Sequence, residues 1–218
     1  MLCGLARFSK RSLIATAVFF PTALLTFHAT HVSTRTSVCT DIPCYKATIP
    51  EPGTLRALAI ITTAATLSSV ILPKLMAKVS NNISAVYLTN LISGFTFGLG
   101  LLISGMASSD KVLAFFAFPD LNNWDPSLAL VIAFGVLPNA IANYLYYGPE
   151  PPRFAPKYDV PANTSGVDWR FVVGSAVFGL AWGLSGVCPG PAALRIIAQP
   201  LWGAQWLAGF WLGSVVNI

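Results

Sequence analysis

The chain has 218 residues, of which 55% are hydrophobic and 10% are charged, and its formal net charge is +5. Soluble domains carry about 25% charged residues. This composition therefore excludes an ordinary soluble domain and predicts an integral, multi-pass membrane protein with the lipid bilayer as its surroundings. The Lys and Arg residues are scattered between apolar runs, so the sequence does not predict nucleic acid as a partner.

Residues 1–54 are predicted to form an N-terminal segment with a signal-like or anchor sequence and a polar loop. Arg7, Lys10 and Arg11 precede an apolar run from Leu13 to Phe27, as in a signal sequence or a signal anchor. That run is short for a membrane span, which needs about 20 residues. The first forty residues contain no acidic residue, which also fits a mitochondrial transit peptide. We expect the plasma (cell) membrane, with a mitochondrial membrane as the alternative.

A transporter-like membrane domain is predicted over residues 55–218. Two apolar pieces, Val112–Phe118 and Ala192–Ala198, are far too short to cross a bilayer. We therefore expect an all-α, polytopic membrane helix bundle with short re-entrant half-helices. The predicted spans are Leu55–Leu72, Ala85–Ser104, Ser127–Tyr147, Trp169–Val187 and Leu201–Val216.

An internal repeat relates the two parts of this domain. A shift of 81 residues aligns Phe97–Ala107 with Phe178–Cys188, and five of the eleven aligned positions are identical. The predicted copies cover about residues 85–147 and 169–218. Each contains a helix, a break rich in small residues, a half-helix and a longer helix. Broken helices in corresponding positions of a repeat point to the substrate site of a transporter, although glycine-rich packing faces can produce similar matches.

The break in the second copy reads "SGVCPGP", from Ser185 to Pro191. Non-helical backbone survives at membrane depth only where protein buries it or where it lines a polar cavity. Pro191 suits the first turn of a half-helix, and the N–H groups of Ala192, Ala193 and Leu194 would then face the break as an anion site. In the first copy, the residues 108–110 are expected to cap the half-helix.

Cys188 is the soft group at this break, because a thiol is a weak donor with a polarizable sulfur. The alternative is a buried cysteine that acts as a small hydrophobe. Arg195 lies two turns further along, on nearly the same helix face, where it would attract an anion or lie at the membrane interface. The predicted substrate-binding residues are Ser104, Gly105, Met106, Ser185, Gly186, Cys188, Pro189, Gly190 and Arg195.

The sequence does not predict a catalytic group, a metal site or a cofactor. Its four cysteines lack the spacing of a metal site. Cys39 and Cys44 could form a disulfide or stay as free thiols. Asp125 is expected to cap the helix that starts near Ser127.

Three stretches resemble the YeeE/YedE sulphur-transport family: "FGLGLLISGMASSDKVLAFFAF", "WDPSLALVIAFG" and "WGLSGVCPGPA". The resemblance covers Leu91 to about Gly213, and it is to the C-terminal half of longer members, whose studied representatives take up thiosulfate. It implies an all-helical fold with short helices that dip into the membrane, and pore cysteines that contact thiosulfate, of which only Cys188 has a match here. The preceding half of the longer members is not found, so a complementary half-subunit or a homo-oligomer is an expected partner.

The leading hypothesis is a membrane permease, not an enzyme, for thiosulfate or a related small sulfur-containing anion that passes Cys188. One alternative is a membrane sulfurtransferase that uses Cys188 as a persulfide carrier, which would need a lowered thiol pKa. Another is a non-transporting half-subunit that needs a complementary partner.

Overall fold

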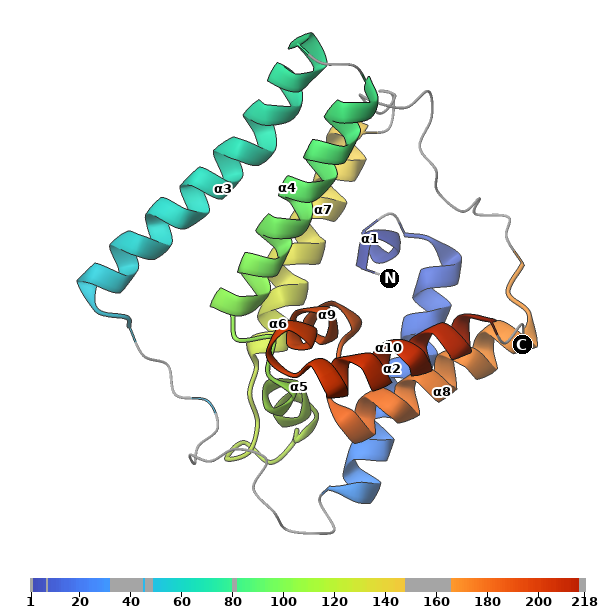
Figure 1. The fold of residues 1–218 in the computed structure, drawn as a ribbon. Helices are drawn as coiled ribbons and strands as arrows, with labels where there is room; N and C mark the ends of the chain where they lie inside the picture. The colour runs from blue at the N-terminus through green and yellow to red at the C-terminus, as the bar shows by residue number, and fades with distance from the viewer. Residues whose placement is uncertain are drawn as a thin grey trace. The chain divides into compact units, whose positions relative to one another are not determined.

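A computed structural model describes residues 2–6, 8–31, 45, 49–79, 82–147 and 166–215, and within these ranges the regular structure is helical throughout. Cys39, Cys44 and most of the connector after residue 147 lie outside the described residues. The elements in Figure 1 are α1 (Leu2–Leu5), α2 (Lys10–Thr30), α3 (Pro52–Val79), α4 (Asn82–Ile103), α5 (Ser109–Phe116), α6 (Ser127–Val131), η2 (Ile132–Val136), α7 (Leu137–Ala142), η3 (Asn143–Tyr147), α8 (Trp169–Ser185), α9 (Pro189–Ala198) and α10 (Pro200–Val215).

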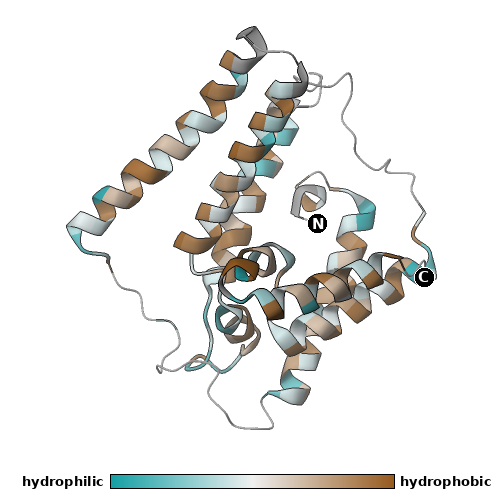
Figure 2. Cartoon of the chain, viewed as in Figure 1, coloured by the Kyte–Doolittle hydropathy of each residue, from teal (hydrophilic) through white to brown (hydrophobic). Residues whose placement is uncertain are grey.

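Four helical stretches are long and apolar enough to cross a bilayer: Lys10–Thr30, Pro52–Leu75, Ser84–Ile103 and Ser127–Leu145. The pair formed by α8 and α9 is bent by 49° at its break, and it is either a fifth, broken span or a re-entrant loop. Apolar residues occur along the whole of these helices (Figure 2). The prediction of an all-α, polytopic helix bundle is confirmed. The described part of α10 has 16 residues, which is shorter than a typical span.

The chain divides into two compact units. The first contains α1, α2 and the elements from α5 to α10, and the second contains α3 and α4, which contact each other. Both predicted half-helices are present, as α5 and α9. They belong to the first unit, which therefore holds both helix breaks.

Helix α2 has 21 residues and is longer than the apolar run Leu13–Phe27 predicted. It begins three residues before that run and ends three residues after it. The hydroxyls of Thr26 and Thr30 donate to the carbonyls of Thr22 and Thr26, four residues earlier, at 2.7 Å each, so these polar groups are satisfied within the helix.

Helix α2 packs against α8 at very short range because α8 presents glycines to it. A Cβ on Gly179 would lie 2.9 Å from Thr22 Cβ and would collide with the Phe19 carbonyl oxygen. A Cβ on Gly183 would lie 3.0 Å from the Ala23 carbonyl carbon and would collide with its oxygen. Small residues allow helix backbones to approach in this way. Helix α2 is thus a packing element of the first unit.

The core of the first unit lies where α2 meets α5. Its buried residues are Ala23, Phe27, Val112, Phe116 and Ala117. Cys188, at the break between α8 and α9, packs against the edge of this cluster. The apolar face of the short helix α5 is therefore buried in protein, which explains why an eight-residue helix is stable here.

The stretch from Ser127 to Tyr147 contains two π-helical segments that hydropathy alone did not predict. Pro138 has no N–H to donate to the preceding turn, and the wider turn η2 lies directly before it. The side-chain amide of Asn139 donates to the Gly135 carbonyl at 2.8 Å. The predicted cap is wrong by one residue, because α6 starts at Ser127 with Pro126 as its N-cap residue. Asp125 still bonds to the start of the helix, since its Oδ1 accepts the Ser127 N–H at 2.8 Å.

The contact between α2 and α8 gives a first prediction. Gly183→Ala should lower the free energy of unfolding by about 1–3 kcal/mol, the usual cost of overpacking a tight contact, because the new methyl group collides with the α2 backbone. Thermal unfolding of the purified protein in detergent measures the effect. Gly174→Ala is the control in the same helix, since nothing lies within 4 Å of a Cβ there. Equal midpoints for the two variants would contradict the packing described.

Candidate functional site

Helix α8 ends at Ser185, and its C-cap residue Gly186 has φ 63° and ψ 10°. This left-handed conformation strains any residue with a Cβ, and a Gly after the last helical residue is a common helix C-cap. The Gly186 N–H donates to the Trp182 carbonyl at 2.8 Å. Cys188 then adopts an extended conformation and serves as the N-cap residue of α9. The position of the break was therefore predictable from its Gly and Pro residues.

Pro191 lies in the first turn of α9, as predicted, but the helix starts two residues before it, and the prediction that the next three N–H groups face the break is wrong. The helix begins at Pro189, so the Ala192 N–H donates to the Cys188 carbonyl at 3.0 Å. The N–H groups of Ala192 and the residues after it therefore do not face the break. Of the first three helical residues, Pro189 and Pro191 have no N–H, and only Gly190 carries one. The backbone contributes little to an anion site, and a negative charge needs a side chain as its partner.

The first break has the same local structure as the second. Gly105 has φ 68°, and the positive-φ glycines among the described residues are Gly105 and Gly186, which are 81 residues apart. Ser108 is the N-cap residue of α5, with its side chain accepting the Asp110 N–H at 3.3 Å. The prediction that this segment caps its half-helix is confirmed. The shared conformation at the repeat spacing is further support for a duplication.

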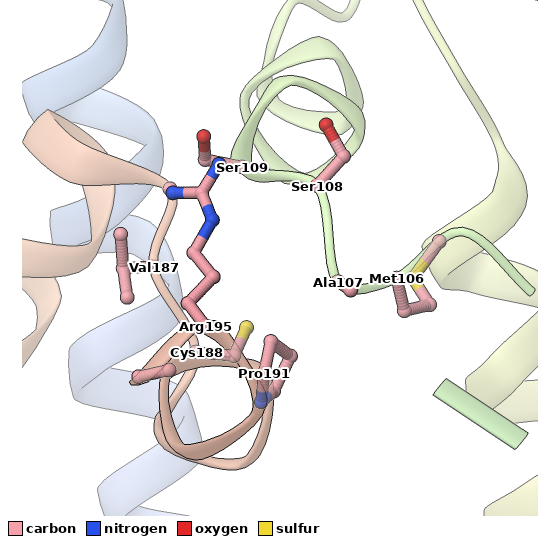
Figure 3. A pocket seen from close by; sticks show the side chains of 10 residues that line it. Met106, Ala107, Ser108, Ser109, Val187, Cys188, Pro191 and Arg195 are labelled. Carbon is pink, nitrogen blue, oxygen red and sulfur yellow. The ribbon is translucent and has the colours of Figure 1, made fainter. Parts of the chain in front are cut away.

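The two breaks contact each other within the first unit. A Cβ on Gly186 would lie 2.6 Å from the Ser109 carbonyl oxygen and 2.7 Å from Leu113 Cγ. The end of α8 therefore packs directly on the start of α5. A small hollow opens where they meet (Figure 3), lined by Met106, Ala107, Ser108, Ser109, Gly186, Val187, Cys188, Pro191, Ala192 and Arg195.

Arg195 supplies positive charge to this hollow. Of the described residues that line it, only Arg195 is charged. Its guanidinium reaches along the hollow toward Ser109 at the start of α5 (Figure 3). The guanidinium carbon also lies 5.5 Å from the centre of the Trp202 ring in α10, a cation–π distance. The acidic residue nearest in sequence to the lining segment of α5, Asp110, is exposed.

Two sulfur atoms belong to the same hollow. Cys188 is half-buried, and its Sγ accepts a hydrogen bond from Trp182 Nε1 at 3.3 Å. Met106 comes from the opposite break and is only 5% exposed. The space between the lining residues has room for about one water molecule. The arrangement combines a fixed positive charge with soft, weakly bonding groups in a narrow, largely apolar setting.

The structure brings together four of the predicted site residues, Met106, Gly186, Cys188 and Arg195. Gly105 adjoins them in the chain, as do Pro189 and Gly190. Ser185 is exposed and bonds locally, donating to the Ala181 carbonyl at 2.8 Å. Ser104 belongs to the other compact unit and donates to the Leu101 carbonyl at 3.2 Å.

Sequence reasoning missed Trp182, whose indole contacts the Cys188 sulfur. It also did not assign Ser108 and Ser109 to the site, although it placed them at the half-helix cap. The available signal for these serines was the repeat, because it aligns the segment after Gly105 with the segment after Gly186.

Residues 85–214 match DUF6691, a family of unknown function. The chain belongs to the DUF6691 family. Two proteins of Xylella fastidiosa, from strains 9a5c and Temecula1 / ATCC 700964, are each named probable transporter and are 35% identical to this DUF6691 chain over 102 residues. That alignment covers 47% of this chain and 68% of each relative. No solved structure matches the chain. The family match includes both breaks and all residues of the hollow, and it starts after α2.

The contact between the breaks gives a second prediction. Gly186→Ala should lower the free energy of unfolding by about 1–3 kcal/mol, because it forces an alanine to positive φ and against the Ser109 carbonyl. The midpoint of thermal unfolding in detergent measures this. Gly209→Ala in α10 is the control, since nothing lies within 4 Å of a Cβ at that position. An unchanged midpoint for Gly186→Ala would show that the breaks do not meet as described.

Proposed function

We propose that this protein is a membrane permease for a small sulfur-containing anion such as thiosulfate, and that the anion passes the hollow between the two helix breaks. The observation that carries the proposal is that one cation and two sulfur side chains, Arg195, Cys188 and Met106, line the same hollow. The names of the Xylella fastidiosa relatives support transport, and the YeeE/YedE-like motifs support the substrate class.

The anion needs a compensating charge, because an anion inside a membrane protein loses most of its hydration. An unpaired charge in an apolar interior costs several kcal/mol or more. Since the α9 backbone offers few free N–H groups, Arg195 is the group that would compensate the anion. A guanidinium is always protonated and presents a fork of N–H donors that fits the oxygens of an oxyanion.

Selectivity would come from sulfur. A thiol donates only a weak hydrogen bond, and both thiols and thioethers are polarizable. The terminal sulfur of thiosulfate is a soft acceptor that suits such a donor, whereas sulfate carries only oxygens and holds its water more tightly. Weak contacts also permit release, which a permease needs as much as binding.

Passage requires the hollow to widen, because a five-atom anion is larger than the water-sized space that is present. Two of its walls are long flexible side chains, those of Met106 and Arg195, which can change rotamer without moving a helix. Pro191 and Ala192 are buried in α9 and form a rigid wall. We therefore expect side-chain motion at the hollow to accompany each passage.

A third prediction concerns charge. Arg195→Gln should reduce uptake of radiolabelled thiosulfate about tenfold to a hundredfold, the scale of one hydrogen bond to a charged group. Arg195→Lys, which keeps the charge and loses the fork, should retain part of the uptake. The assay uses the full chain, expressed alone in cells that lack their own thiosulfate uptake. Unchanged uptake by Arg195→Gln at equal membrane abundance would remove Arg195 from the pathway.

A fourth prediction concerns the thiol. Cys188→Ala should reduce thiosulfate uptake about twofold to fivefold, because a weak hydrogen bond is worth ~0.5–1 kcal/mol, and it should leave thermal unfolding nearly unchanged. Excess sulfate should compete poorly in the unmodified protein and better, relative to thiosulfate, in Cys188→Ala. Full uptake by the variant would exclude Cys188. A persulfide on Cys188 after thiosulfate exposure, detected by mass spectrometry, would instead indicate sulfur transfer.

A further inference from the structure

Trp182 holds the break between α8 and α9 through two separate contacts. Its carbonyl accepts the Gly186 N–H at 2.8 Å, which closes the helix. Its indole Nε1–H donates to Cys188 Sγ at 3.3 Å. Backbone and side chain of one residue therefore fix both the turn and the thiol that follows it.

The indole itself is held by aromatic rings from three helices. Phe116 of α5 packs edge-on against it, with centroids 4.9 Å apart and an interplanar angle of 88°. Phe19 of α2 lies at 5.5 Å, and Phe178 of α8 stacks at 6.3 Å. Phe116 is fully buried. A ring enclosed in this way keeps its N–H direction without losing further rotamer freedom on contact with sulfur.

This contact determines what the thiol can still do. A thiol has one weak donor and a weakly accepting sulfur. The indole N–H of Trp182 occupies one lone pair of the Cys188 sulfur. The S–H bond therefore points in one of the other directions around the Cβ–Sγ bond. The sulfur atom faces the hollow (Figure 3). A hydrogen bond accepted by a group also strengthens the bond that the group donates.

We propose that Trp182 is a positioning residue: its indole N–H orients the Cys188 thiol so that S–H is presented to an anion in the hollow. This inference rests on the proposed function and specifies how its soft donor is aimed. Packing alone would be satisfied by any large aromatic ring at position 182. The indole N–H is the part of the side chain that the proposal needs.

The test uses the full chain with Cys3, Cys39 and Cys44 replaced by Ser, so that Cys188 is the remaining thiol. Trp182→Phe keeps an aromatic ring and removes the N–H. Trp206→Phe is the matched control, because Trp206 stacks on Phe210 of α10 at 5.5 Å and is not a residue of the hollow.

The first readout is the infrared S–H stretching band of Cys188 in purified protein, identified by its loss in Cys188→Ala. We expect the band to move to higher frequency in Trp182→Phe, because the thiol becomes a weaker donor, and to stay unchanged in Trp206→Phe. A band that does not move in Trp182→Phe would overturn the proposal.

If Trp182→Phe does not fold, indole nitrogen NMR on the otherwise unchanged protein decides the same point. With ¹⁵N-labelled tryptophan, Cys188→Ala should shift one indole N–H resonance through the loss of its sulfur acceptor. An indole spectrum that is identical with and without the thiol would overturn the proposal.

The second readout separates positioning from packing. Trp182→Phe should raise the thiosulfate concentration for half-maximal uptake about threefold, and it should have no further effect in a Cys188→Ala background. An equal loss in both backgrounds would show a structural role and overturn the proposal. If the unmodified protein takes up no thiosulfate while the band still moves, the permease proposal fails and the orientation of the thiol by Trp182 stands.

Discussion

The constraint on which this structure depends is that a bilayer offers no water to unpaired backbone groups. A helix that stops at membrane depth must find partners for its last carbonyls and its next N–H groups within the protein. At the second break the Gly186 N–H returns to Trp182, and the Ala192 N–H returns to Cys188. Two prolines remove two further donors. Several backbone groups of the break are therefore satisfied by its own residues.

The small number of free backbone N–H groups at the break changes which group could compensate the charge of an anion. A half-helix that starts with three free N–H groups can bind an anion through its backbone, and the sequence pattern suggested such a site. With Pro at the first and third positions of α9, that option is mostly closed. In the proposed function the side chain of Arg195 takes this role, since it lines the hollow together with the start of α5. Charge compensation would then reside in a flexible side chain, which can move with a passing ion.

The sequence predicted most of the architecture and only part of the site. Apolar length and composition were enough for the three spans from α3 to η3 and for the two half-helices, whereas Lys10–Thr30 was predicted too short for a span and α10 is shorter than one. The repeat placed Gly105 and Gly186 in equivalent positions, and both have positive φ. The start of α9 was missed because Pro189 and Pro191 both suit a first turn. The extent of α2 was missed because the residues at its two ends, 10–12 and 28–30, are mostly charged or polar and hydropathy excludes them, although they are helical.

The contact between Trp182 and Cys188 could not be read from the sequence for a different reason. A spacing of six residues across a helix end has no fixed geometry, and it depends on the αL turn at Gly186 and on the rotamer of the indole. That rotamer is set by Phe19 and Phe116, which come from helices far away in the chain. The orientation of the thiol group therefore depends on tertiary packing and not on the local sequence pattern.

The same packing links helix α2 to the site, although α2 lies outside the DUF6691 match. Gly179 and Gly183 let the α2 backbone come close enough for Phe19 to reach the indole. A bulkier residue at either glycine would separate the two helices. Phe19 would then lose its contact with the Trp182 indole. The close approach of α2 and α8 therefore has two consequences at once: it supports the first unit, and it fixes the donor that touches the Cys188 sulfur. Stability and the orientation of the thiol are not independent in this protein, because both depend on the same two glycines.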